Sequence, residues 1–209
     1  PYPENHHASF EDLVLLPANL SRLVIDPYRD SCNVATDIAG KVKLELPVLA
    51  AGLDGLPLEL KRALAVALAN VGSAYIGRRP LPDSTAPWLQ MIVHGYDMPD
   101  PMAAGYVYLS PAGFAPFKVE KPAAGKLLGL VARAKELTAA IPFALDNGFD
   151  LMIMDVTSGI AGTWPELNGH PDFTVLRDAM CILRKMNREE DIDLVHFGGV
   201  RSGTDIAKL

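Results

Sequence analysis

Cysteine is scarce in this sequence. Its 209 residues include two cysteines, Cys32 and Cys181, which lie far apart and form no C-x-x-C pair. This spacing argues against a redox motif and predicts two free, buried thiols, as is usual in a reducing cytoplasm. We therefore expect a cytoplasmic protein.

Long apolar runs and targeting signals are missing as well. No stretch approaches the roughly 18 apolar residues of a membrane-spanning helix, and the first residues lack the apolar core of a signal peptide. We expect a soluble protein that makes no contact with a membrane.

Positive charge is neither abundant nor clustered. The 19 Lys and Arg residues are outnumbered by 25 Asp and Glu residues, which gives a net charge of −6. This balance, with no basic cluster to offset it, argues against a nucleic-acid partner. A hydrophobic content of 49% over 209 residues is typical of one soluble globular domain.

Several catalytic motifs are also absent from the sequence. There is no Walker loop, no G-x-S-x-G elbow and no context for a cysteine nucleophile. His94 and His196 are single histidines without a second ligand at metal-binding spacing. No metal site is therefore expected.

What the sequence does contain is an alternation of short apolar segments with longer helical ones. Short, wholly apolar segments are typical of parallel strands that are covered on both faces. The alternation therefore predicts a parallel α/β fold. The expected helices are 56–72, 134–148 and 172–190, and the seven expected strands are 47–53, 73–79, 88–96, 106–110, 126–132, 150–156 and 193–199.

A barrel is favoured over an open, doubly wound sheet. The first strand-to-helix turn, A-G-L-D-G-L-P, is not a G-x-G-x-x-G fingerprint. Polar, glycine-rich turns follow several strands, as at the face of a barrel where a site forms. We predict a TIM (β/α)8-type barrel over 47–209 with about seven of its eight strands, and an N-terminal arm over 1–46 that packs on it.

The end of the chain, D-L-V-H-F-G-G-V-R-S-G-T-D-I-A-K-L, carries the first candidate site. An apolar strand runs into Gly198 and Gly199, and a helix is expected to begin at Thr204 or Asp205. Adjacent glycines allow a tight turn and a close approach of a ligand, and amides at a helix start favour an anion. Phosphate binding is predicted for Gly198, Gly199, Arg201, Ser202 and Gly203. In the alternative interpretation the glycines only relieve steric crowding, and Ser202 or Thr204 caps the helix.

A second candidate site follows the sixth strand. Asp155 ends a buried strand, where an unpaired carboxylate would be costly, so it is expected either to face the catalytic mouth or to tie down a loop. Gly159 and Gly162 allow the following loop to approach a ligand, and Thr163 adds a hydroxyl group. In the alternative interpretation, Asp155 only braces its own loop.

A third candidate lies at the end of the second expected strand. Arg78 and Arg79 follow S-A-Y-I-G and could bind an anion. In the alternative interpretation both guanidinium groups are simply exposed to solvent.

These motifs resemble those of a known family. The stretch F-E-D-L-V-L-L-P-A-N-L-S-R-L-V-I-D-P-Y-R-D (10–30), the loop D-V-T-S-G-I-A-G-T (155–163) and the ending G-G-V-R-S-G-T-D-I-A-K-L (198–209) are similar to the flavin-binding barrel of the glutamate synthases. Relatives include the large subunits of N-methylglutamate synthase type. The order and spacing match over most of the chain, least well over 80–125.

The resemblance implies an FMN-dependent oxidoreductase. It would reduce an imine, formed from 2-oxoglutarate and ammonia or an amine, to glutamate or N-methylglutamate. FMN phosphate would be held at the 198–203 turn, with Gly159, Gly162 and Thr163 near the flavin or the substrate. Asp155 and Arg78 would be catalytic. The resemblance also implies an electron-donor or glutaminase subunit and an oligomer.

The chain departs from the family in several places. The eighth strand and the cysteines that hold an iron–sulfur cluster in the family do not occur, and the loop 155–163 is longer than the family's glycine-dense turn. The first and seventh strands would then have exposed edges, and we expect further sequence or another chain to close the barrel. Two alternatives remain: a non-catalytic barrel subunit that serves as an assembly partner, and another phosphate-binding barrel enzyme.

Overall fold

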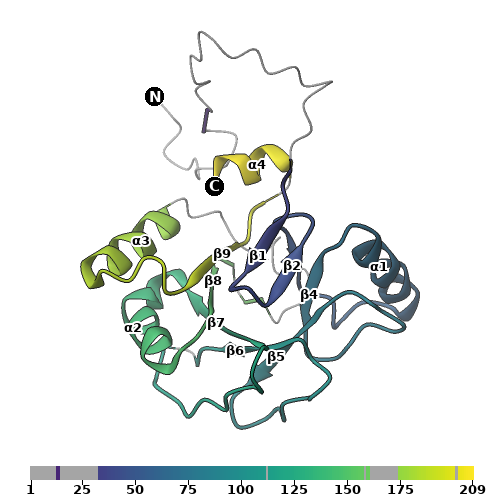
Figure 1. Cartoon of the computed structure of the whole chain (residues 1–209), viewed down its shortest axis with the longest axis horizontal. Coiled ribbons are helices and arrows are strands. Elements are labelled where there is room, and N and C mark those ends of the chain that lie inside the picture. The colour runs from purple at the N-terminus through teal and green to yellow at the C-terminus, as the bar shows by residue number, and fades with distance from the viewer. Residues whose placement is uncertain (1–12, 15–32, 112, 158, 161–173, 201) are drawn as a thin grey trace.

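The sheet consists of seven parallel strands that follow one another in chain order. The computed structural model describes residues 13–14, 33–111, 113–157, 159–160, 174–200 and 202–209. Each strand pairs with the next, and the sheet curls into a half-barrel (Figure 1). The strands are β3 (Leu49–Ala50), β4 (Ala74–Gly77), β5 (Trp88–Val93), β6 (Gly105–Leu109), β7 (Leu127–Arg133), β8 (Leu151–Asp155) and β9 (Asp193–Phe197). All seven predicted strands are confirmed, five of them with shorter bounds and two, β6 and β7, shifted by one residue, and the sheet forms a half-barrel of TIM type.

Three helices lie on the outer face of this sheet. In Figure 1, α1 (Leu58–Asn70) lies on one side of the curl, whereas α2 (Leu137–Asn147) and α3 (Thr174–Met186) lie on the other. A short 3-10 turn, η2 (Ala134–Glu136), leads into α2, and α2 ends at Gly148 with a left-handed φ of 70°. The glycine C-cap is the usual reason for a helix to stop there. The three predicted helices are confirmed.

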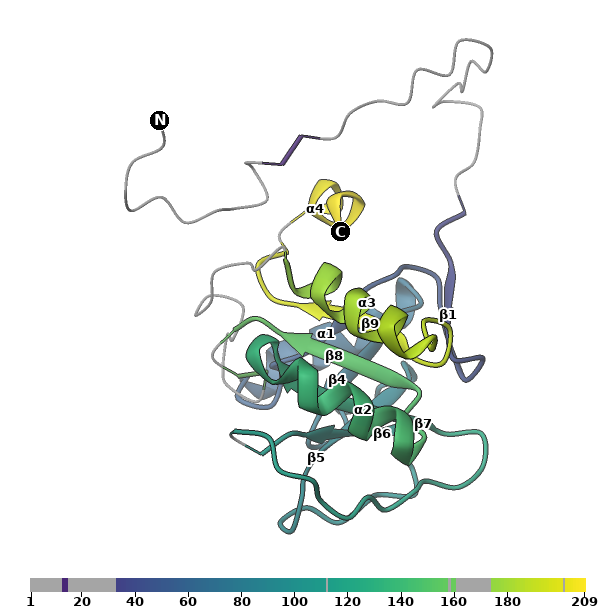
Figure 2. The same ribbon diagram turned by 90° about the vertical axis from the view of Figure 1, so that its left-hand side faces the viewer.

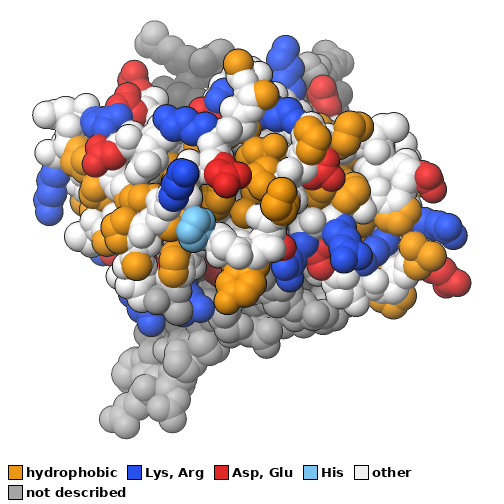
Figure 3. All heavy atoms as spheres, turned by 90° about the horizontal axis from the view of Figure 1, so that it is seen from below, with side chains coloured by type: hydrophobic (Ala, Val, Ile, Leu, Met, Phe, Trp, Pro, Cys, Tyr) orange, Lys and Arg blue, Asp and Glu red, His pale blue; other side chains and the backbone are white. Residues whose placement is uncertain are grey.

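Among the described residues, loops take the place of crossover helices in three connections, and one of them, 78–87, joins β4 to β5. In the part of the chain that the structure describes, loops at 94–104 and 110–126 connect β5 to β6 and β6 to β7. The 94–104 loop exposes Tyr96, Met98 and Met102, each with at least 85% of its surface accessible. On the face seen from below, apolar side chains lie among interspersed Lys, Arg, Asp and Glu side chains (Figure 3).

Side chains alternate between the two faces of the sheet because successive residues of a strand point to opposite sides. Tyr75, Trp88 and Met152 belong to the cluster on the outer face, which contacts the helices. Ile76 and Leu89 belong to the cluster inside the curl. The sheet is therefore buried on both faces, as the wholly apolar strands predict.

A hairpin that the sequence did not predict closes the amino end of the half-barrel. Strands β1 (Thr36–Ile38) and β2 (Val42–Leu44) are antiparallel and bury Ile38, Val42 and Leu44 in the inner cluster. The Lys41 ammonium lies 2.7 Å from an Asp150 carboxylate oxygen, and the Ala39 amide donates to Asp193 Oδ2 at 2.7 Å. Both carboxylates lie at the amino ends of strands, so the hairpin is fixed to this end.

The half-barrel is open between its first and last strands. Within the described residues, β3 and β9 are the two ends of the sheet and do not pair with each other. Helix α4 (Gly203–Lys208) lies off the sheet, beside this open side in both ribbon views (Figures 1 and 2). Because β3 and β9 are both edge strands, part of their backbone hydrogen-bonding capacity faces this opening.

One prediction about cysteine is wrong. Cys181 is exposed on α3, because this helix buries Val175, Ala179 and Leu183 against the sheet and residue 181 lies on another side. Cys32 lies outside the described residues. Among the helices of the described residues, none is long and apolar enough to cross a membrane.

Candidate functional site

The candidate residues that the structure describes lie at one end of the half-barrel. Since all seven strands are parallel, their carboxyl ends share one rim, which is where sites form in barrels of this type. Arg78 follows β4 on this rim, Asp155 ends β8, and Gly198 follows β9. The topology alone therefore brings together three segments that are far apart in the sequence.

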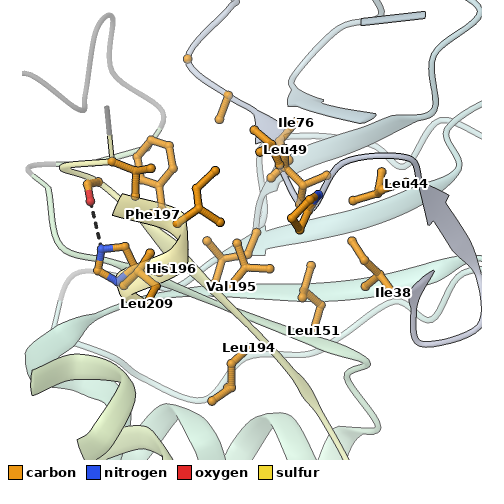
Figure 4. A pocket seen from close by; sticks show the side chains of 18 of the residues that line it. Ile38, Leu44, Leu49, Ile76, Leu151, Leu194, Val195, His196, Phe197 and Leu209 are labelled. Carbon is orange, nitrogen blue, oxygen red and sulfur yellow. Dashed lines mark hydrogen bonds between the residues drawn. The ribbon is translucent and has the colours of Figure 1, made fainter. Parts of the chain in front are cut away.

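An apolar cavity of about 870 Å³ lies at the open side of the half-barrel (Figure 4). It is lined at the carboxyl rim by Ala51, Gly52, Gly198 and Gly199 and extends down to the hairpin. Its walls are mostly aliphatic and aromatic, and they include Leu49, Ile76, Leu151, Ile153, Val195 and Phe197. We call this space the seam cavity.

The two glycines after β9 adopt the tight turn that the sequence predicts. Gly198 has a φ of 122° and Gly199 a φ of 75°, both in the region that side chains disfavour. A Cβ atom on Gly198 would lie 2.6 Å from Thr157 Cγ2 and 2.8 Å from Val156 Cγ2. Gly198 is therefore required where the loops after β8 and β9 touch, and its predicted contact with a phosphate stays a prediction.

The end of this turn caps the last helix. Ser202 Oγ accepts from the Asp205 amide at 3.3 Å, and Asp205 Oδ2 accepts from the Ser202 amide at 3.0 Å. This reciprocal pair is a capping box, in line with the alternative interpretation of Ser202. The helix begins at Gly203, just before the expected start at Thr204 or Asp205, and Arg201 lies outside the described residues.

Asp155 makes three hydrogen bonds within its own loop. Its Oδ1 accepts from the Thr157 amide at 2.8 Å and from Thr157 Oγ1 at 2.6 Å, and its Oδ2 accepts from the Ile160 amide at 2.9 Å. The residue is 3% exposed and does not line the seam cavity. These contacts correspond to the alternative that Asp155 braces its loop, and its catalytic role stays a prediction.

The loop after Asp155 is described only in part. The Gly159 amide donates to Thr157 Oγ1 at 3.1 Å, and Gly159 has a φ of 143° with open space where a Cβ would lie. Gly162 and Thr163 lie outside the described residues. The predicted contacts of this loop with a flavin stay predictions.

A second, more polar cavity of about 390 Å³ lies beside α1 and the end of β4. Arg78 and Arg79 line it, together with Asp54, Lys61 and Asp97. Leu53 lines both this space and the seam cavity, so the two adjoin. We call it the rim cavity.

The Arg78 guanidinium is paired rather than open to a ligand. Its Nη2 lies 2.6 Å from Asp97 Oδ1, and its backbone amide donates to both oxygens of Asp54 at 3.1 and 3.0 Å. Asp97 Oδ2 accepts in turn from the Val93 amide at 2.9 Å. Asp97 is not among the residues predicted from the sequence, because only the fold brings its loop against the end of β4.

The Arg78–Asp97 ion pair should make the free energy of unfolding depend on pH in the acid range. Burial raises the pKa of Asp97, but the hydrogen bonds from Arg78 and Val93 outweigh it and hold that pKa below its usual value. A carboxyl with a depressed folded-state pKa contributes stability above its unfolded pKa of about 3.9 and loses it as the pH falls through the folded value. In urea titrations, D97N should be less stable than the wild type at pH 7, and the difference should shrink below about pH 4.

A control variant separates this effect from a general loss of charge. Asp178 pairs with Arg177 on the exposed side of α3, with 53% of the Asp178 side chain accessible. D178N should change the free energy of unfolding by less than about 0.5 kcal/mol at either pH. A D97N difference that stays constant from pH 7 to pH 3 would contradict the depressed pKa.

The structure does not bring the two predicted catalytic residues into one cavity. Arg78 lines the rim cavity, and Asp155 lines neither cavity. His196 Nε2 lies 2.9 Å from the Gly198 carbonyl oxygen, at the edge of the seam cavity. Among the residues with described positions, no group of His, Cys, Asp and Glu is arranged to hold a metal ion.

Comparisons with known proteins agree with the architecture. No protein-family model and no curated protein matches the chain. Solved structures of flavocytochrome b2 mutants are similar to this chain in fold. One with pyruvate bound aligns with a TM-score of 0.59 and 16% identity over 97% of this chain and 62% of that one. One with sulfite bound gives a TM-score of 0.58 with 15% identity over 97% and 62%.

A third structure, a flavocytochrome b2 mutant with benzoylformate, aligns with a TM-score of 0.54 and 14% identity over 84% of this chain and 57% of that one. The chain thus spans about three fifths of the length of these proteins. At such low identity the likeness concerns the fold. The half-barrel corresponds to part of the fold of these flavocytochrome b2 chains.

Proposed function

We propose that the chain is the flavin-binding barrel of an FMN-dependent oxidoreductase of the glutamate synthase type. The observation that carries the proposal is the seam cavity, which joins the end of β3 to the Gly198–Gly199 turn at the carboxyl rim. The similarity of the fold to flavocytochrome b2 and the resemblance of the closing motif to glutamate synthases support the same function.

The residues of the seam cavity fit a flavin. Its volume of about 870 Å³ lies within the range of about 300–1,000 Å³ usual for small-molecule sites, and apolar walls suit a planar aromatic ring. Ala51, Gly52 and Phe197 would lie against the ring. The phosphate would lie at Gly198, Gly199 and Gly203, with Arg201 as its cation and the 159–163 loop nearby.

The chain's own residues would position the reactants. A bound flavin supplies hydride transfer, and the protein supplies binding, orientation and the exclusion of water. Asp155 acts in this proposal as a positioning residue, because it fixes the loop beside Gly198. The substrate is an imine of 2-oxoglutarate with ammonia or an amine, and the product is glutamate or N-methylglutamate. An electron-donor or glutaminase subunit, an oligomeric state and a cytoplasmic location belong to the same proposal.

A cavity-filling variant tests the proposal. Titration with FMN should give saturable quenching of flavin fluorescence. A51W places an indole group in the seam cavity and should weaken FMN affinity at least about 100-fold, which is about 2.7 kcal/mol. A63W makes the same change on the exposed side of α1 and should bind FMN like the wild type. If the wild type takes up no FMN, or if A51W binds it normally, the proposal is wrong.

The second candidate function is an assembly partner without catalysis. The unpaired edges of β3 and β9, with an apolar cavity between them, favour it within the described residues. It predicts a colourless protein that forms a complex of fixed stoichiometry and takes up no FMN. Sedimentation of the protein with and without FMN distinguishes the two functions.

A further inference from the structure

The rim cavity carries positive charge that the fold does not neutralise. Its lining includes three cationic side chains, Lys61, Arg78 and Arg79, and two carboxylates, Asp54 and Asp97. One positive charge is therefore left over, in a chain whose net charge is −6. The lining exposes more polar than apolar surface, unlike that of the seam cavity.

Both carboxylates of the cavity are already engaged. The two oxygens of Asp54 accept from the Arg78 amide, and the two oxygens of Asp97 accept from the Arg78 guanidinium and from the Val93 amide. These contacts hold the ends of β4 and β5 in place. Asp97 is paired with Arg78, whereas Asp54 keeps its negative charge beside Lys61 and Arg79, so the cavity retains one positive charge.

Among the described residues, neither Lys61 nor Arg79 forms an ion pair with a carboxylate. Lys61 Nζ donates to the backbone carbonyl oxygen of Asp54 at 2.7 Å, which is a neutral acceptor. Arg79 is exposed at the cavity, and in the described part of the chain no carboxylate lies within ion-pair distance of its guanidinium. Ammonium and guanidinium groups at the wall of one small cavity favour an anion, and the fork of arginine matches a carboxylate or a phosphate.

We propose that the rim cavity is a binding site for a small anion with a carboxylate or phosphate group, held by Arg79 and Lys61. A volume of about 390 Å³ is at the lower end of the range for small-molecule sites, so the ligand is a small metabolite. Asp54 and Asp97 fix the backbone and side chain of Arg78, and so hold the adjacent Arg79 at the cavity wall. The site does not depend on the flavin, because it shares only Leu53 with the seam cavity.

Calorimetric titration of the cofactor-free protein tests the site, with inorganic phosphate and 2-oxoglutarate as separate probes. At least one probe should bind saturably with a dissociation constant below about 1 mM, and the binding should weaken as salt is added. Saturation by 2-oxoglutarate alone identifies a carboxylate site, and saturation by phosphate alone identifies a phosphate site.

Three variants locate the binding. R79A should weaken it at least about 10-fold, or about 1.4 kcal/mol, and K61M should weaken it in the same direction. R62A is the control: Arg62 is the next residue of α1, is exposed and lines neither cavity. This variant should change the affinity by less than about twofold. R79K retains the charge without the fork and should fall between R79A and the wild type.

The proposal is wrong if neither probe saturates the wild type at about 10 mM, or if R79A and R62A bind alike. Urea midpoints of R79A and R62A should match that of the wild type, because both side chains are exposed. The anion titration contains no flavin. A protein that binds no anion can therefore still bind FMN, and a protein that binds no FMN can still bind the anion.

Discussion

Replacing Gly105 with alanine should destabilise the half-barrel by about 3 kcal/mol, the upper part of the range for overpacking a core. Gly105 begins β6 and pairs with Leu127 of β7. A Cβ atom at this position would lie 2.6 Å from the Leu127 carbonyl oxygen and 2.6 Å from Leu127 Cβ. Neither atom is at the end of a flexible side chain, so the two strands must move apart.

Two other glycines provide graded controls for this variant. A Cβ atom on Gly129, in β7, would lie 3.3 Å from Val107 Cγ2, which need move by only a few tenths of an ångström, so G129A should cost about 1 kcal/mol. Gly203 has open space, and G203A should stay within about 0.5 kcal/mol of the wild type. The measurement is the midpoint of urea unfolding at constant m-value. A G105A protein as stable as G203A would show that β6 and β7 are not packed this closely.

Replacing Asp155 with alanine should cost about 3 kcal/mol or more. The carboxylate accepts from the amides of Thr157 and Ile160 and from the Thr157 hydroxyl group, and it is 3% exposed. Its removal leaves two backbone amides without an acceptor, and each such loss costs about 1–3 kcal/mol. For a chain of this length, the melting temperature should fall by roughly 6–12 °C.

The stability of D155A distinguishes a bracing role of Asp155 from a catalytic role, because unfolding is measured without flavin or substrate. D155N keeps one carbonyl oxygen as an acceptor and should lie between D155A and the wild type in stability. D178A removes an exposed carboxylate from α3 and should have almost no effect. If D155A is as stable as the wild type, the carboxylate does not brace the loop, and its predicted catalytic role becomes the better interpretation.

Much of the fold could be predicted because the strands are recognisable locally. Each is a short apolar run bounded by glycine, proline or acidic residues, and each is found within a few residues of its expected bounds. The hairpin at 36–44 escaped prediction for the opposite reason. Its strands have three residues each, and contacts with Asp150 and Asp193, more than 100 positions away, fix it on the sheet.

The candidate site was predicted less completely. Two predicted pairs, Gly198–Gly199 and Arg78–Arg79, lie at the carboxyl rim, because each directly follows a strand of the parallel sheet. Their partners could not be read from spacing. Asp97 reaches Arg78 across 19 positions, and Lys61 joins them from the exposed end of a helix.

The sequence by itself determined the order and parallel direction of the seven strands in the main sheet, because alternating apolar strands and helices permit few other arrangements. Only the tertiary structure decided which charged groups are already satisfied. Asp155 binds its own loop and Asp97 binds Arg78, whereas Arg79 keeps its charge exposed at a cavity. A hydrogen bond depends on distances of a few ångströms between atoms, and folding sets those distances among segments that the sequence keeps far apart.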